Sequence, residues 1–293
     1  MGRPNPGTER TVAVLNYLAA RPHERFGLSE LCRRLGMSKA TAHAQVGALT
    51  EAGYLLRHPV EKTYSLGPAL IGLGNAAAAR QYDVVEEARG PMARLAEELD
   101  VQCVASAAYG WEMVMLARAG RTDPLGVTVE VGGRIPLVPP LGTVFMAWSD
   151  ADDIDAWLRR LGPDAGEPEL DRYREAILTV RRRGFSLGLD SASRARLQAA
   201  RVPDRALPGV VDELGHEEYI LLELEQSASY DLSLVAAPVF GSDGRVVLAV
   251  TLFGFRAPLR GRDVPGVAAR LCEETGSVTR AIGGAEPAPS TTL

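Results

Sequence analysis

The stretch Gly36–Val46, GMSKATAHAQV, decides the first part of the fold. Gly36 can end a helix because glycine adopts positive φ without strain, and Ser38 can cap a new helix through its hydroxyl. Before the stretch, Leu31 and Leu35 have the i, i+4 spacing of one helix face. Two helices joined by about three residues that include a glycine form a helix-turn-helix.

Neighbouring segments extend this motif. An earlier helix is expected to begin at Thr8, as its cap, and to stop before Pro22. Ser29 is the expected cap of the second helix, and the third helix is expected to run from Ser38 to Ala52. The chain therefore opens with three short helices.

The third helix has two unlike faces. Its buried stripe is predicted at i, i+4 and i+7, from Ala42 through Val46 to Leu49. The start of its other face is small and polar, as in a recognition helix that enters the major groove of DNA. Its residues are Ser38, Lys39, Thr41, His43, Ala44 and Gln45. Lys39 can meet phosphate, whereas His43 and Gln45 can hydrogen-bond base edges. A helical hairpin that packs on another domain remains the alternative.

The residues after this helix predict a wing. YLLRH (54–58) and TYSLG (63–67) read as two short strands around the turn PVEK (59–62). Arg57 and Lys62 are expected to contact phosphates or to reach toward the minor groove. Because one winged helix makes few contacts, a dimer or tetramer on pseudo-palindromic half-sites is expected.

Charge is distributed unevenly along the chain. Residues 1–67 contain nine Lys/Arg and five Asp/Glu, net +4, so that the rest of the chain carries 23 basic and 32 acidic residues, net −9. A basic N-terminal part suits binding to DNA, although a solvated surface has the same composition. No run of about 18 apolar residues and no signal-peptide pattern occurs, so a cytoplasmic location is expected.

The second part of the chain predicts an α+β domain. Helices are expected over 84–99, 153–161, 169–184 and 261–282, and strands over 101–109, 112–120, 126–131, 219–224, 232–240 and 245–255. GSDG (241–244) is a hairpin turn between the last two strands. These elements indicate an antiparallel sheet flanked by helices. The expected division is a winged helix over 1–67, a linker helix over 68–82, a second domain over 83–283 and a disordered tail over 284–293.

The run Leu28–Gly74, which ends in YSLGPALIGLG, resembles the N-terminal domain of IclR-family transcriptional regulators. Three further stretches extend the resemblance to residues 8–282: GGRIPLVPPLG (132–142), RRGFSLGLD (182–190) and LVAAPVFGSDGRVVLAVTLFGF (234–255). It is weakest between residues 191 and 231. The resemblance implies a GAF-like effector-binding domain behind the winged helix, and a double-stranded DNA operator and a small-molecule effector as partners.

The resemblance also implies an effector pocket between the sheet and residues 132–142. Leu234 stands where relatives often have cysteine and Phe253 where they often have serine, while Thr251 keeps a hydroxyl. Val138-Pro139-Pro140 replaces a more polar run, and Ala44 replaces a frequent arginine in the recognition helix. An apolar or aromatic effector is expected, although these residues can also be the plain core of a vestigial domain. The candidate pocket residues are Met115, Leu137, Met146, Trp148, Asp190, Leu234, Thr251 and Phe253.

Enzymatic chemistry finds little support. GFSLG (184–188) matches GxSxG, but it follows a predicted helix and begins a strand, the reverse of a nucleophile elbow. Only His216 lies downstream as a possible base, and no phosphate-binding glycine loop occurs. The three cysteines are widely spaced and are expected in the core. No activity, cofactor or metal is expected; an enzyme with a fused DNA-binding module and a protein-interaction module remain the alternatives.

Overall fold

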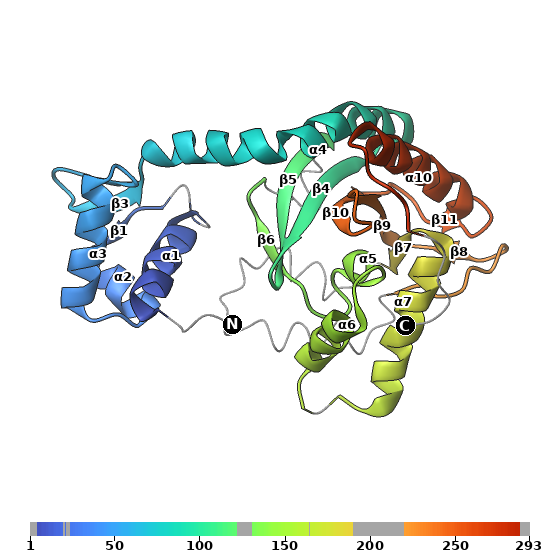
Figure 1. Ribbon diagram of the computed structural model, residues 1–293, viewed down its shortest axis with the longest axis horizontal. Helices are drawn as coiled ribbons and strands as arrows, with labels where there is room; N and C mark the ends of the chain where they lie inside the picture. The colour runs from blue at the N-terminus through green and yellow to red at the C-terminus, as the bar shows by residue number, and fades with distance from the viewer. Residues whose placement is uncertain are drawn as a thin grey trace. The chain divides into compact units, whose positions relative to one another are not determined.

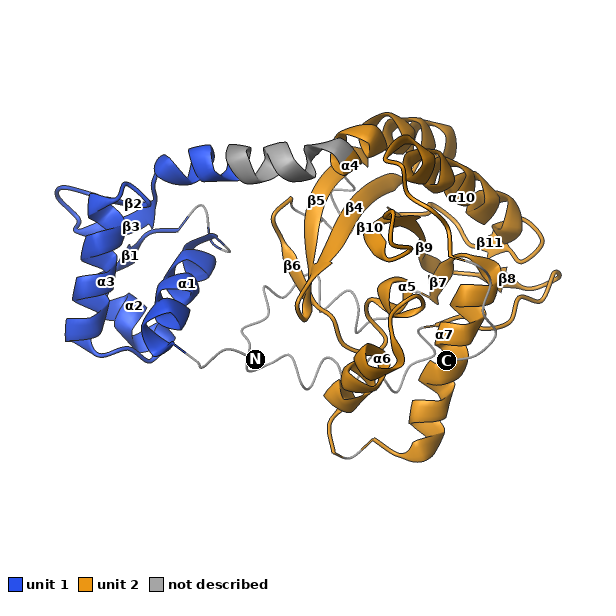
Figure 2. Ribbon diagram, viewed as in Figure 1, with its two compact units in different colours: residues 1–81 blue, residues 82–293 orange. Residues whose placement is uncertain are grey.

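The computed structural model describes residues 5–19, 21, 24–121, 131–163, 165–189 and 220–287, without the side chains of 75–83. The chain divides into two compact units, Met1–Gln81 and Tyr82–Leu293 (Figure 2). Within the described ranges, no helix combines the length and the apolar content that crossing a bilayer requires.

The first unit is a winged helix. Its elements are α1 (Pro6–Ala19), β1 (Phe26–Gly27), α2 (Leu28–Leu35), α3 (Lys39–Glu51), β2 (Leu55–Arg57) and β3 (Thr63–Leu66). The strands form an antiparallel sheet in the order β1-β3-β2 (Figure 1). Val14, Leu31, Val46 and Leu55 fill the core between helices and sheet. The predicted helix-turn-helix and wing are confirmed, whereas β1 was not predicted.

The turn between α2 and α3 is built as the sequence predicts. Gly36 ends α2 at φ 62°, and the Ser38 hydroxyl accepts from the Thr41 amide at 3.2 Å. Ala42, Val46 and Leu49 are buried.

Two of the predicted helix caps are wrong. Thr8 lies inside α1, because the Asn5 side chain accepts from the amides of Gly7 and Thr8 at 3.1 and 3.3 Å. Ser29 lies inside α2, whose N-cap is Gly27. Pairing of Phe26 and Gly27 with β3 holds these residues extended, so the helix begins directly after them.

The second unit is an α+β domain built on a six-stranded sheet. Its strand order is β6-β5-β4-β10-β9-β7, with antiparallel neighbours throughout. The strands are β4 (Gln102–Tyr109), β5 (Glu112–Gly120), β6 (Arg134–Pro136), β7 (Ser186–Leu189), β9 (Leu232–Phe240) and β10 (Val246–Phe253). A two-stranded sheet pairs β8 (Ser229–Tyr230) with β11 (Leu259–Arg260). The predicted fold class is confirmed.

Helices cover both faces of the large sheet (Figure 1). On one side, the α10 face, lie α10 (Val264–Ala281) and the later part of α4 (Ala69–Leu99). On the other, the α5 face, lie α5 (Thr143–Met146), α6 (Ala151–Leu158) with the 3-10 turn Arg159–Leu161, and α7 (Glu167–Arg183). Because β4 and β10 are covered on both sides, they read as almost unbroken apolar runs.

Several predicted boundaries shift. The strand predicted over 219–224 is wrong in the described residues, where Ile220 makes a single bridge to Gly188 and the chain then leaves the sheet. Residues 126–130, predicted as a strand, lie outside the described residues, and β6, β8 and β11 were not predicted. The tail predicted to be disordered from residue 284 is ordered at its start. The amides of Gly284 and Ala285 donate to the carbonyls of Thr279 and Gly241 at 2.7 and 3.1 Å.

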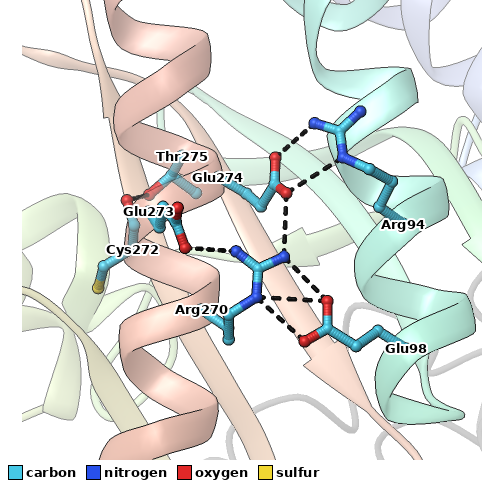
Figure 3. A network of polar contacts seen from close by, with 7 residues as sticks. All are labelled: Arg94, Glu98, Arg270, Cys272, Glu273, Glu274 and Thr275. Atoms are coloured by element: carbon cyan, nitrogen blue, oxygen red, sulfur yellow. Dashed lines mark hydrogen bonds and ion pairs between the residues drawn. The ribbon is translucent and has the colours of Figure 1, made fainter.

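An ion-pair network joins α10 to the later part of α4 (Figure 3). Arg94 donates to both carboxylate oxygens of Glu274, at 2.6 and 3.2 Å. Arg270 donates to Glu98 at 2.9 Å and to Glu274 at 3.2 Å. The Glu274 side chain is only 9% exposed. One nearly buried carboxylate therefore receives two guanidinium groups.

These contacts change how the two carboxyl groups titrate. Hydrogen bonds from Arg94 hold the pKa of the Glu274 carboxyl below its usual value, and those from Arg270 lower the pKa of Glu98. A carboxyl group whose pKa is lowered by folding stabilises the fold above its unfolded pKa, near ~4.3. That stabilisation is lost as the pH falls through the lower folded pKa.

Replacing Glu274→Gln should lower the free energy of unfolding at pH 7 by about 1–3 kcal/mol, because two guanidinium groups lose their shared carboxylate. The difference from the wild type should narrow as the pH falls through the lowered pKa of the folded Glu274 carboxyl, because the wild-type carboxylate then also becomes protonated. Urea denaturation measures both effects. The neighbouring Glu273→Gln is the matched control, since Glu273 is 70% exposed, and its cost should stay within about 0.5 kcal/mol. Equal costs for the two variants would contradict a special role for Glu274.

Candidate functional site

The start of α3 is exposed on the side away from its buried stripe. Ser38, Lys39, His43 and Ala44 are exposed there. Since Ala42 holds the opposite side of the same turn in the core, these side chains face away from the first unit. The surface is small and polar, with one cationic side chain, so another molecule can approach the helix closely.

The remaining two predicted contact residues of α3 are partly buried and already bonded. Thr41 lies 2.8 Å from Ser38, hydroxyl to hydroxyl, so both hydroxyls belong to the helix cap. The Gln45 amide nitrogen donates to the Gly7 carbonyl in α1 at 3.0 Å. The structure therefore uses Gln45 to join α3 to α1, and a base contact through its amide nitrogen would have to replace this bond.

The wing presents a second set of cations. Arg57 is exposed on β2, with its guanidinium carbon 5.8 Å from the centre of the Tyr64 ring. Lys62 is exposed in the following turn, where its backbone is left-handed at φ 56° and its ammonium donates to the Pro59 carbonyl. The His58 amide donates to the Thr63 carbonyl at 2.8 Å and closes the turn. The hairpin thus carries both predicted phosphate contacts on one short ribbon.

The predicted effector residues divide into groups. Phe253 pairs with Leu234, and the neighbouring Thr251 pairs with Ala236, so all of these residues lie on the α5 face. Met115, Leu137 and Met146 are buried in the apolar cluster above the same face.

The structure does not bring Trp148 to the Leu234 position. Its ring meets Phe240 at 5.1 Å between centres, at the other end of β9. Six residues of strand, about 20 Å, separate Phe240 from Leu234. Asp190 lies outside the described residues. The residues brought together are therefore Leu234, Thr251 and Phe253.

The sequence reasoning passed over two polar residues on these strands. Gln102 on β4 is 5% exposed and Ser233 on β9 is 6% exposed. Neither side chain has a hydrogen-bond partner among the residues that the structure describes. The sequence could have indicated that Gln102 is a buried polar residue. It is the one amide in the apolar run VQCVASAAY, and on a strand it lies on the same face as Val104.

The GxSxG match is not a nucleophile elbow. Gly184 ends α7 and Ser186 lies buried on β7, so the segment runs from helix to strand. Burial raises the pKa of the Cys103 thiol to about 12 and that of Cys272 to about 11, which keeps both protonated at neutral pH. Over the described ranges, no group of three or more His, Cys, Asp or Glu side chains could hold a metal ion. His216 lies outside those ranges.

The first unit matches a known domain. A family model described as the IclR helix-turn-helix domain matches residues 7–59, from the second residue of α1 to just past the end of β2. The first unit therefore contains a helix-turn-helix domain of the IclR type. The glycerol operon regulatory protein of Streptomyces griseus is 37% identical over 75 residues, 26% of this chain and 29% of that protein. The matched stretch thus spans less than a third of that relative's length.

Solved structures match the fold of nearly the whole chain. An IclR transcriptional regulator from Alicyclobacillus acidocaldarius is 21% identical and covers 96% of this chain and 100% of its own, with a TM-score of 0.67. An IclR homolog from Microbacterium hydrocarbonoxydans complexed with 4-hydroxybenzoate is 18% identical over 94% of this chain and 98% of its own, with a TM-score of 0.64. At these identities the two structures show that the chain shares their fold.

Replacing Gln45→Ala should loosen α1, because the variant loses the bond to the Gly7 carbonyl. One such bond is worth about 1 kcal/mol, so the amides at the start of α1 should exchange roughly fivefold faster. Hydrogen–deuterium exchange of the full-length protein measures this rate. His43→Ala, on the exposed side of the same helix, is the matched control and should leave α1 unchanged. Unchanged exchange in both variants would show that the Gln45 contact is unimportant.

Proposed function

We propose that this protein binds double-stranded DNA through the start of α3 and the β2–β3 wing, and regulates transcription in response to a small molecule. The observation that carries the proposal is the exposed, small and polar surface of α3, with Lys39 at its start and Arg57 on the adjoining hairpin. The net charge of +4 over residues 1–67 supports the same partner.

The two kinds of contact should have different roles. Lys39, Arg57 and Lys62 are suited to phosphate, which contributes affinity without sequence preference. His43 is exposed at the position from which a recognition helix reads base edges. Ala44 is too short for a polar contact, so the operator should differ from those of relatives with a longer side chain there.

Lys39→Gln and Arg57→Gln should each weaken binding to all duplexes and flatten the dependence of log affinity on log salt by about one unit. His43→Ala should instead reduce the difference in affinity between an operator selected from random duplexes and unselected DNA. Fluorescence anisotropy at several salt concentrations separates the two effects. Arg134→Gln is the matched control, since Arg134 is a cation of the second unit paired with Glu112 at 2.6 Å. A similar change in slope for this control would count against the assigned surface.

A second copy of the chain is proposed as the partner in DNA binding. The first unit has an apolar groove of about 520 Å³, lined by Leu56, Leu66, Gly67, Pro68, Leu70 and Ile71. Leu56 is 53% exposed, Ile71 66% and the adjacent Leu73 52%. Apolar surface of this kind marks protein contacts. The groove belongs to the unit that must be present twice to read two half-sites, which supports a second copy as its occupant.

Ile71→Asp should therefore convert the dimer into monomers and weaken binding to the selected operator by at least tenfold, because a charge would be buried in an apolar contact. Light scattering and anisotropy measure the two changes. Val12→Asp is the control, since Val12 is 48% exposed on α1 but does not line the groove. A wild type that is monomeric at micromolar concentration and still binds one site tightly would refute the proposal.

The effector site is proposed on the α5 face, around Leu234, Thr251 and Phe253. Apolar side chains at two of these positions favour an apolar or aromatic ligand, and Thr251 supplies a hydroxyl. The complex of the Microbacterium homologue with 4-hydroxybenzoate, which has an aromatic ring, supports this class of ligand.

A further inference from the structure

Gln102 is a buried polar group that the DNA-binding proposal leaves unused. It is 5% exposed, and both its amide nitrogen and its amide oxygen lack a hydrogen-bond partner within the described structure. Burying an amide without hydrogen-bond partners destabilises the folded protein, because the amide loses its bonds to water and gains none in return. Such a group calls for an explanation in a folded protein.

The strand register places Gln102 beside the proposed effector residues. Gln102 on β4 pairs with Phe253 on β10, which pairs with Leu234 on β9, which pairs with Gly188 on β7. Paired residues on neighbouring strands share a face of the sheet. Phe253 and Leu234 pack against the apolar cluster of the α5 face, so these four residues form one row across that face. We call it the Gln102 row.

A second unpartnered group lies near the opposite end of the Gln102 row. The Ser233 hydroxyl is 6% exposed and has no partner in the described residues. It lies 2.9 Å from the point where a side chain of Gly188 would begin, and a carbon of Leu234 lies equally near that point. A Cβ at position 188 would thus collide with both side chains, so glycine is required where Ser233 and Leu234 pack against β7. Since β4 and β9 are two strand spacings apart, about 10 Å separates the backbones that carry the two polar groups.

The chemistry of the Gln102 row defines a ligand. Gln102 offers an amide, with donors and an acceptor side by side, at one end of the row, and Ser233, next to Leu234, offers a hydroxyl. Between them lie the aromatic side chain of Phe253 and the aliphatic one of Leu234. None of the row's described side chains is charged, which favours a neutral group over an ionised one at the amide. A neutral group that both donates and accepts satisfies the glutamine completely.

We propose that the Gln102 row binds an uncharged aromatic molecule with a carboxamide-like group at one end and a hydroxyl at the other. Gln102 pairs with the carboxamide, Ser233 with the hydroxyl, and the ring lies against Phe253 and Leu234. This inference rests on the proposed effector site and adds the functional groups that this site selects.

The test uses four probes that differ in one group each: 4-hydroxybenzamide, benzamide, phenol and the charged 4-hydroxybenzoate. Calorimetry on the full-length wild type should show at least tenfold tighter binding of 4-hydroxybenzamide than of phenol or 4-hydroxybenzoate. Gln102→Met keeps the length of the side chain without its polar atoms. This variant should bind 4-hydroxybenzamide 10- to 100-fold more weakly, through loss of paired hydrogen bonds, and phenol within twofold of the wild type.

Two further variants locate the ends of the ligand. Ser233→Ala should weaken binding of phenol and 4-hydroxybenzamide several-fold and leave benzamide unchanged. Ser106→Ala is the matched control, because Ser106 is equally buried on β4 but pairs with Ala249, outside the Gln102 row. It should change none of the four affinities. Thermal unfolding adds a readout without ligand: Gln102→Met should raise the midpoint of the free protein, since an unpartnered amide is removed.

Several results would overturn the inference: equal losses for phenol and 4-hydroxybenzamide in Gln102→Met, preference of the wild type for 4-hydroxybenzoate, a lower midpoint in Gln102→Met, or no binding of any probe at millimolar concentration. DNA binding of the wild type, measured in parallel on the selected operator, separates this failure from that of the proposed function. Retained operator binding leaves the regulator proposal standing, whereas absent binding refutes it whatever the probes show.

Discussion

The covering of the central sheet on both faces is the constraint on which the second unit depends. β4 and β10 have helices on either side, so every side chain on them must be apolar, small or hydrogen-bonded. Most of their residues meet this condition with aliphatic or alanine side chains. Gln102 does not, and its position in the row with Phe253 and Leu234 makes the exception informative. In a fold of this kind, an unsatisfied polar group is a better pointer to a binding site than an apolar residue, because apolar residues are needed there in any case.

A different constraint shapes the first unit, where one helix must both hold the core and present a surface. One side of α3 packs into the core through Ala42, Val46 and Leu49. The other side is exposed and carries Lys39 and His43. Gln45 lies at the border and is bonded to α1. A substitution at Gln45 therefore alters both the packing of α1 and the proposed DNA-contacting surface, whereas one at His43 alters that surface alone.

The sequence predicted the elements that have strong local signals, and it missed those that arise from tertiary pairing. The Gly36–Ser38 turn, the hairpin over 54–67 and the long strands β4, β5, β9 and β10 all follow from caps, turns and apolar runs. The strands β1, β6 and β8 are two or three residues long and form only because a partner strand is nearby, so no local sequence pattern predicts them. The position of Trp148 also depends on tertiary packing. Its ring contacts Phe240, at the other end of β9 from Leu234, and no local sequence pattern indicates this contact.

α4 is the covalent route by which a ligand at the proposed effector site could affect the first unit, for which we propose DNA binding. Its first turn is bonded within the first unit, where the Ala69 amide donates to the Gly53 carbonyl at 3.2 Å. Its later part is bonded within the second unit, where Arg94 and Glu98 meet α10 through Glu274 and Arg270. α10 packs in turn on β9, the strand that carries Leu234 and Ser233. A ligand that shifts β9 would therefore act on α10 and the ion-pair network first. The Glu274 carboxylate is the shared acceptor of that network, so its integrity should determine how strongly ligand binding and DNA binding are coupled.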